Sequence, residues 1–286
     1  MKIEELRIPA PWGHIAVKTW NEPSSEAILV THGYMDNVAS FDNLLPLLPK
    51  QFYYICFDLP GHGLSDHFPK GTFLMTLDYL LVFKIMVDYF KRDSYIFLGH
   101  SYGAQIGILF SQLYPDYIKK IIVLDTISFK PINFFLSLEV GMDLILNEKQ
   151  RKVYSFEEAV NKITQNRAFG KVDKKSAENL AKRSLEKISE NQYVFRMDPR
   201  LKERINPTWE FDYLKQTHLK FPVKCQGVFI FFNESPFHRI FKLIYEHLRD
   251  RGFEIHHLDG NHDYHITHPE VVVPIITEFL LRRHKL

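Results

Sequence analysis

Residues 95–110 read YIFLGHSYGAQIGILF and contain a G-x-S-x-G pattern at Gly99, Ser101 and Gly103. A β-rich apolar run precedes the pattern and a helical repeat follows it, so the serine falls on a sharp turn between a strand and a helix. Such a turn strains the backbone, and the two glycines let neighbouring backbone approach without a Cβ clash. The hydroxyl is then exposed beside the first helical amides, which can stabilise a negative oxygen. The motif predicts that Ser101 is a nucleophile.

The sequence on both sides of this turn alternates between strand and helix patterns. Between Ile3 and Asp125, apolar runs such as AILVTHG and FYYICFDLPG alternate with helical patterns at 77–90 and 102–113. This alternation predicts βαβ units and a mostly parallel sheet, whose strands read as continuous apolar runs because both faces are buried. The predicted fold class is α/β.

The pattern changes from about Ile127 to Leu214. Strand signals are sparse there, and three segments read as amphipathic helices with charged faces, at 134–146, 155–163 and 175–189. Later patterns comprise strands at 223–232 and 253–258 and helices at 238–250 and 269–283. We therefore divide the chain into a first core part (1–126), a helical cap (127–214) and a second core part (215–286).

A serine hydroxyl needs a base within hydrogen-bonding reach, normally a histidine. His262 in GNHDYH follows the last strand pattern and therefore lies at the carboxyl end of a strand, where ligands bind in open α/β sheets. His100 is the alternative, but its position next to Ser101 on the turn is expected to point it away from the hydroxyl. We predict that His262 is the base.

The chain carries four motif segments in order: THGYMDN with SFDNLLPLL, FDLPGHGLSD, GHSYG and GNHDYHITHPE. They resemble the α/β-hydrolases, and more narrowly the serine hydrolase-like proteins of the Kraken type. The resemblance implies an eight-stranded, mostly parallel sheet flanked by helices, with the helical cap inserted after the sixth strand. It also implies an oxyanion hole formed by the backbone amides of Tyr34 and Tyr102. The turn from Asp58 to Ser65 is expected to be structural.

The acid of a Ser-His-acid triad is less clearly marked. The family pattern places an aspartate after the seventh strand, but that segment reads VFIFFNESPF and offers Glu234. Asp125, at the end of the sixth strand pattern, is the alternative, although it can instead cap the start of the insertion. Both keep the chain order Ser, acid, His. We favour Glu234, with Asp125 second and Asp259 as a further candidate.

These residues predict a serine hydrolase that cleaves a carboxylic ester or a similar acyl bond of a small molecule, with no cofactor. A carbon–carbon bond hydrolase, and a ligand-binding receptor or pseudo-enzyme on the same fold, remain alternatives. A zinc site is the other reading of the cluster formed by His256, His257, His262, His265 and His268. We do not favour it, because alternation sends two of them to opposite faces of a strand and neither cysteines nor clustered carboxylates complete a ligand set.

Composition excludes some partners. With 36 basic and 34 acidic side chains, the net charge of +2 gives no electrostatic signature of nucleic acid or membrane binding. No apolar run approaches the ~18 residues of a membrane span. Cys56 and Cys225 fit no disulfide or metal pattern and are expected to be free, buried thiols. A cytoplasmic location is expected; peroxisomal import is the alternative, because residues 284–286 (HKL) resemble the peroxisomal tripeptide. The sequence does not indicate an oligomeric state.

Overall fold

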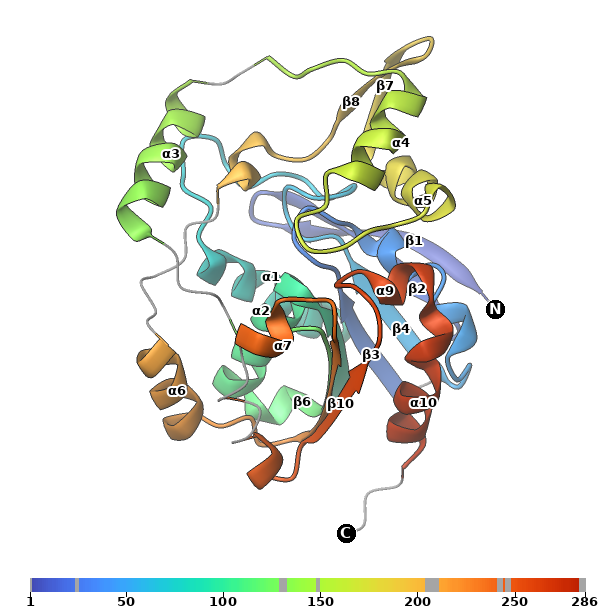
Figure 1. Cartoon of the computed structure of the whole chain (residues 1–286), viewed down its shortest axis with the longest axis vertical. Coiled ribbons are helices and arrows are strands. Elements are labelled where there is room, and N and C mark those ends of the chain that lie inside the picture. Colours follow the sequence, from blue (N-terminus) through green and yellow to red (C-terminus); the bar gives the residue numbers. More distant parts are fainter. Residues whose placement is uncertain are drawn as a thin grey trace.

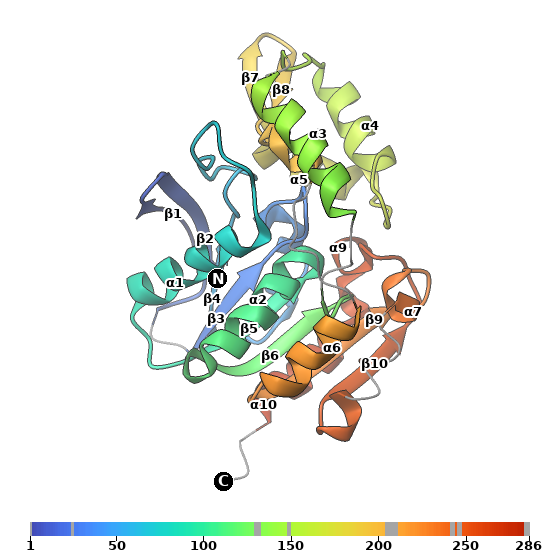
Figure 2. The same cartoon turned by 90° about the vertical axis from the view of Figure 1, so that its left-hand side faces the viewer.

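A central sheet organises the structure, a computed structural model that describes residues 2–23, 26–128, 133–147, 150–203, 211–240, 244 and 248–282. Helices cover both faces of the sheet, and an insertion lies over one end of it (Figures 1 and 2). The eight strands are, in spatial order, β1 (Ile3–Ala10), β2 (Gly13–Trp20), β4 (Phe52–Phe57), β3 (Glu26–Thr31), β5 (Tyr95–His100), β6 (Ile118–Leu124), β9 (Gln226–Phe232) and β10 (Glu254–Leu258). β2 runs antiparallel to β1 and β4, and the pairs from β4 to β10 are parallel. The predicted eight-stranded, mostly parallel sheet is confirmed.

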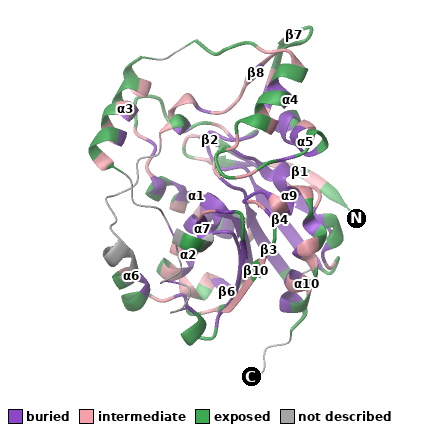
Figure 3. Cartoon of the chain, viewed as in Figure 1, coloured by how far each residue is buried: buried purple, intermediate pink, exposed green. Residues whose placement is uncertain are grey.

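The central strands β4 and β5 are buried at every position because each face of the sheet packs against helices. In β5, Tyr95 and Phe97 belong to the core on the side of α1 (Tyr79–Phe90) and α2 (Ser101–Leu113). Ile96 and Leu98 alternate with them and belong to the core on the side of α10 (Val273–Leu281). Figure 3 shows this buried centre beneath a more exposed insertion. Each fully buried side chain of this size contributes about 1.5–3 kcal/mol.

The carboxyl-terminal part of the chain completes the sheet and carries two short helices, α7 (Phe237–Ile240) and α9 (Tyr264–Thr267). The helix predicted at 238–250 lies partly outside the described residues, at 241–243 and 245–247, and the tripeptide at 284–286 lies wholly outside them. Among the described residues, no helix has the length and apolarity that crossing a membrane requires. Both cysteines are free thiols; Cys56 is buried and Cys225 is partly buried.

The insertion follows β6 and precedes β9, as predicted. Its described elements are α3 (Phe134–Leu146), α4 (Phe156–Gln165), α5 (Lys174–Ser184), β7 (Leu185–Ser189), β8 (Gln192–Phe195) and the 3-10 turn Pro199–Lys202. The next helix, α6 (Phe211–Lys220), lies beside α2 of the core, where Gln112 donates to the carbonyl of Phe221 (Figure 2). The helix expected at 175–189 ends at Ser184, because the chain continues into an antiparallel hairpin of β7 and β8. Its two-residue turn places Asn191 at a φ of 50°. The boundary expected at residue 214 falls within α6.

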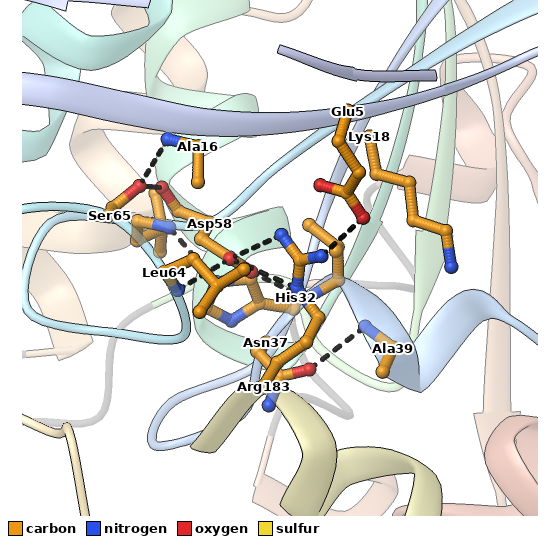
Figure 4. Close-up of polar contacts among 12 residues, drawn as sticks. Glu5, Ala16, Lys18, His32, Asn37, Ala39, Asp58, Leu64, Ser65 and Arg183 are labelled. Carbon is orange, nitrogen blue, oxygen red and sulfur yellow. Dashed lines mark hydrogen bonds and ion pairs between the residues drawn. The ribbon is translucent and has the colours of Figure 1, made fainter. Parts of the chain in front are cut away.

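A buried arginine of α5 joins the insertion to the core (Figure 4). The Arg183 guanidinium donates to Asp58 Oδ2 at 2.9 Å and to Glu5 Oε1 at 2.6 Å. Asp58 is fully buried and also accepts backbone N–H groups from Val38 (2.8 Å) and Leu64 (2.9 Å). The carboxylate therefore stabilises the turn after β4, in agreement with the structural role expected for that turn.

Candidate active site

Ser101 lies on the sharp turn that the motif predicts. It is the first residue of α2, directly after β5, and its φ of 48° is in the left-handed region. The flanking glycines allow the close packing that this turn requires. A Cβ atom at Gly103 would lie 2.4 Å from the His32 carbonyl oxygen, and one at Gly99 would lie 2.7 Å from the Cα atom of Ala104. Side chains at these positions would displace the backbone around Ser101.

A continuous chain of hydrogen bonds joins Ser101, His262 and Asp125. Ser101 Oγ lies 2.8 Å from His262 Nε2, and His262 Nδ1 lies 2.5 Å from Asp125 Oδ2. The carboxylate can only accept, so Nδ1 carries the proton and Nε2 is left to accept from the hydroxyl. The relative exposures of the three residues are 8%, 6% and 0%. This geometry can remove a proton from Ser101 as the hydroxyl attacks a carbonyl carbon.

The acid beside His262 is Asp125, so our preference for Glu234 is corrected. Asp125 follows β6, the strand next to β5, and its Oδ1 also accepts the Phe232 N–H at 3.0 Å. Glu234 follows β9, one strand farther from Ser101, in a turn where it is exposed. It contacts the His262 loop through its backbone, whose N–H donates to the Gly260 carbonyl at 3.0 Å. Asp259 instead accepts from Asn233, at 2.9 Å.

The two residues expected to form the oxyanion hole lie on either side of Ser101. Tyr102 is the second residue of α2, and first-turn amides point out of a helix N-terminus. Tyr34 lies in the loop after β3, which passes close to the nucleophile, since a Cβ atom at Gly33 would lie 3.4 Å from Ser101 Cβ. The Tyr34 ring packs edge-on against Tyr102 with centroids 5.1 Å apart, and its hydroxyl donates to the Leu201 carbonyl of the insertion.

His100, the alternative base, holds the backbone of His262 instead. Its Nε2–H donates to the His262 carbonyl at 2.9 Å, and the two rings lie 4.6 Å apart. Burial, reinforced by the neighbouring His265 and His262, lowers the pKa of His100 well below its usual value. His100 is therefore a neutral donor, a role that its place in the motif does not reveal.

Sequence reasoning also missed a buried ion-pair cluster formed by Arg167, Asp36 and Asp263. Arg167 belongs to the loop between α4 and α5, and it contacts both carboxylates with hydrogen bonds that include one of 2.8 Å to Asp36 and one of 2.9 Å to Asp263. The three residues are widely separated in sequence, so no local pattern could have paired them.

A cavity of about 740 Å³ contains Ser101 and His262 in its lining, a volume typical of small-molecule sites. The core contributes the loop after β3, the turn that carries Ser101, and Phe237. The insertion contributes apolar side chains, among them Leu144, Tyr154, Ile163, Phe169 and Phe195. Three lysines of the insertion, Lys152, Lys162 and Lys202, also line the cavity.

The histidines of the carboxyl-terminal region do not form one cluster. His256 and His257 are on β10, and within the described chain the group best placed for a metal consists of His100, His262 and Asp263, whose ligand atoms lie within 4.8 Å of one another. Each of these residues already has a protein partner. His100 binds the His262 carbonyl, and the His262 ring binds Ser101 and Asp125. Asp263 binds Arg167. Because these three side chains already bind protein groups, the site does not favour zinc.

Comparison with known proteins agrees with this fold. The profile described as "alpha/beta hydrolase fold" matches residues 26–219. The zebrafish (Danio rerio) "Serine hydrolase-like protein" is 28% identical over 96% of this chain and 88% of its own length. The human "Serine hydrolase-like protein 2" is 28% identical over 99% of this chain and 96% of its own length. The crystal structure of a hypothetical protein from Pseudomonas aeruginosa superposes with a TM-score of 0.83 at 25% identity, covering 98% of this chain and all of its own. The resemblance derived from the motifs is confirmed, and the chain belongs to the α/β-hydrolase fold family.

Proposed function

We propose that this protein is a serine hydrolase that cleaves a carboxylic ester or a similar acyl bond of a small molecule. The observation that carries the proposal is the hydrogen-bonded chain from Ser101 through His262 to Asp125, beside a cavity of small-molecule size. Membership of the α/β-hydrolase fold family and similarity to serine hydrolase-like proteins support a hydrolase. The acyl bond is the finer assignment, made from the chemistry of the three side chains.

In the first half of the reaction, Ser101 Oγ attacks the carbonyl carbon while its proton moves to His262 Nε2. The carbonyl oxygen becomes negative, and the amides of Tyr34 and Tyr102 stabilise it. The tetrahedral intermediate then collapses, the leaving group takes the proton from Nε2, and the acyl group remains on Oγ.

In the second half, water replaces the leaving group. His262 accepts a proton from the water as its oxygen attacks the acyl carbon, and the same proton returns to Oγ when the carboxylic acid leaves. Asp125 fixes the orientation and tautomer of the imidazole and stabilises the imidazolium in both halves. The groups in this cycle all belong to the protein, so we propose no cofactor.

Hydrolysis of a p-nitrophenyl ester series of increasing acyl length tests the proposal. We expect Ser101→Ala to lower kcat by about 10⁴–10⁶-fold with folding unchanged. Ser111→Ala is the matched control, because Ser111 is buried on the same helix and donates within it to the Ile108 carbonyl at 2.7 Å. Equal turnover by wild type and Ser101→Ala would contradict the proposal. A folded wild type that binds acyl ligands without cleaving them would favour a ligand-binding receptor on the same fold. Cleavage of substrates with a carbon–carbon bond in place of the ester, and of no ester, would favour a carbon–carbon bond hydrolase.

A further inference from the structure

One guanidinium of the insertion contacts both loops that surround Ser101. Arg167 Nη1 and Nη2 donate to the two carboxylate oxygens of Asp36 at 3.1 and 2.8 Å. Arg167 Nε and Nη2 donate to the two oxygens of Asp263, the second bond measuring 2.9 Å. The side chains are 14% exposed for Arg167 and 3% for each aspartate. A planar guanidinium can serve two carboxylates in this paired manner, whereas an ammonium group cannot.

The two aspartates lie next to the groups that the proposed reaction uses. Asp36 is two residues beyond Tyr34, in the loop after β3, and its N–H donates to the Gly33 carbonyl at 3.2 Å. Asp263 directly follows His262. The ion pairs of Arg167 therefore join the loop that contains Tyr34 to the loop that contains His262.

Other residues of the Arg167 loop reinforce the contact with the base. The Phe169 ring lies edge-on to His262 with centroids 6.1 Å apart, and the Lys171 N–H donates to Asn261 Oδ1 at 3.1 Å. Gly170 packs directly on the carboxylate, since a Cβ atom there would lie 1.8 Å from Asp263 Oδ2. The loop thus contacts His262 and its neighbours on both sides.

The charges in this cluster depend on one another. Burial disfavours the charged form of Arg167, but Asp36 and Asp263 outweigh it and raise the pKa of Arg167 well above its usual value. Burial alone would raise the pKa of Asp263, but Arg167 outweighs that effect and the pKa of the carboxyl is lowered. Arg167 and Asp263 are therefore both ionised, and removal of Arg167 leaves buried carboxyl groups without their partner.

We propose that Arg167 is a positioning residue through which the insertion holds the Tyr34 loop and the His262 loop in their catalytic arrangement. The active site is then complete only while the insertion is docked on the core. This inference rests on the proposed function, because it explains how the same site is assembled. It predicts a loss of turnover rather than a loss of substrate binding when Arg167 is changed.

Arg183 supplies the matched control. It is also a buried arginine of the insertion and also pairs with a buried core carboxylate, Asp58, at 2.9 Å. Its second partner is Glu5 on β1, and neither partner adjoins Ser101, His262 or Tyr34 in sequence. A general loosening of the insertion should follow from either change, whereas disorder of the His262 loop should follow from the Arg167 change alone.

The kinetic experiment compares Arg167→Gln, Arg167→Lys and Arg183→Gln on a p-nitrophenyl ester, with kcat referred to the folded fraction. We expect Arg167→Gln to lower kcat about 10²-fold with a smaller change in KM, and Arg167→Lys to recover part of the loss. Arg183→Gln should stay within about threefold of wild type. Equal losses for the two glutamine variants, or wild-type kcat in Arg167→Gln, would overturn the proposal.

A second readout does not depend on ester turnover. The proton between His262 Nδ1 and Asp125 should give a strongly downfield imidazole N–H resonance in wild type and Arg183→Gln. We expect it to shift or broaden in Arg167→Gln, and an unchanged resonance would count against the proposal. Wild type that shows the resonance but cleaves no ester would remove the proposed function while leaving the positioning role testable.

A neutral triple variant covers the case in which Arg167→Gln does not fold. Arg167→Met combined with Asp36→Asn and Asp263→Asn leaves no buried charge unpaired, so we expect near-native thermal unfolding. The ion pairs that join Arg167 to both loops are still lost, and kcat should again fall about 10²-fold. A folded triple variant with wild-type kcat would disprove the role of the link.

Discussion

The acid and the base of the proposed triad are held by different parts of the molecule. Asp125 directly follows β6, which pairs with β5 on one side and β9 on the other, and its own N–H donates to the Ile230 carbonyl at 2.8 Å. His262 lies in the loop after β10, where side chains hold it: His100 binds its carbonyl, and Arg167 binds the next residue, Asp263. Backbone pairing fixes the acid, whereas ionisable side chains fix the base.

The position of Asp125 is therefore expected to be rigid, whereas the position of His262 depends on the charge state of neighbouring side chains and on the docking of the insertion. Sheet hydrogen bonds do not depend on pH near neutrality or on the docking of the insertion. The contacts of the His262 loop depend on the neutrality of His100 and on the ion pairs of Arg167. We therefore expect changes at Asp125 to affect the chemistry alone, and changes around His262 to affect chemistry and stability together.

Among changes to the residues that hold the acid and the base, the largest effect should come from Asp125→Asn. The amide cannot hold the imidazole in the correct tautomer, so we expect kcat to fall by about 10³–10⁴-fold. Its carbonyl oxygen can still accept the Phe232 N–H, so thermal unfolding should change little. Steady-state kinetics and calorimetry on one preparation measure both. A variant with near-normal kcat would show that Asp125 is not the acid.

The second prediction concerns folding stability at acid pH, through the buried histidines next to His262. Burial lowers the pKa of His265 to about 3 and that of His100 well below its usual value. Both histidines bind protons near pH 6.5 when unfolded but remain neutral when folded, so the unfolded state binds more protons and stability falls as the pH drops below about 6.5. The loss at pH 5 should be about 2 kcal/mol for His265, and His100 should add to it in the same direction.

Urea unfolding at pH 7 and pH 5 measures this loss, and His265→Phe isolates one contribution. Neither ring nitrogen of His265 has a hydrogen-bond partner among the described residues, so the substitution breaks no such bond. The pH dependence should become shallower in the variant. An identical dependence in both proteins would mean that His265 protonates without unfolding.

His100→Phe should have a smaller effect. It keeps an aromatic ring against His262 but removes the donor to the His262 carbonyl, so we expect kcat to fall about 10-fold with KM little changed. His256→Phe on β10 is the control, since His256 is partly exposed and pairs with Glu254 at 3.7 Å. Equal kcat values for the two variants would show that the base loop does not need this bond.

Glu234→Gln should have the smallest effect, with kcat within about twofold of wild type. Its carboxylate is exposed, and its contact with the base loop comes from the backbone N–H, which the substitution retains. The same kinetic assay as for Asp125→Asn makes the comparison direct. A 100-fold loss would restore Glu234 as the acid.

The parts of the site that depend on local sequence could be predicted. The strand, the turn with Ser101 and the following helix are specified by neighbouring residues, and His262 follows from its place after the last strand. The choice of acid depends on which strand lies next to β5, and motif order is the same for Asp125 and Glu234. Sequence order alone could not separate them, because the deciding quantity is a distance across the sheet.

The parts that depend on contacts across the insertion could not be predicted. Helical spacing of apolar residues predicts α4 and α5, but it also predicts a helix over 185–189, where the structure has β7, because LEKIS continues the amphipathic repeat. Arg167 and Asp263 are 96 positions apart, so their pairing follows from how the insertion folds back on the core. Such a contact has no periodicity for a pattern to detect.

Backbone strain is concentrated where the chemistry is proposed. Of the six non-glycine residues with positive φ in the described part of the chain, Met35, Ser101 and Asp125 lie in or beside the site, at 62°, 48° and 57°. Each such conformation costs of order 1–3 kcal/mol. The fold thus contains a stability–activity trade-off, and an inactive Ser101→Gly variant should unfold at a higher temperature than the native enzyme. Selection for thermostability alone would therefore act against the catalytic turn.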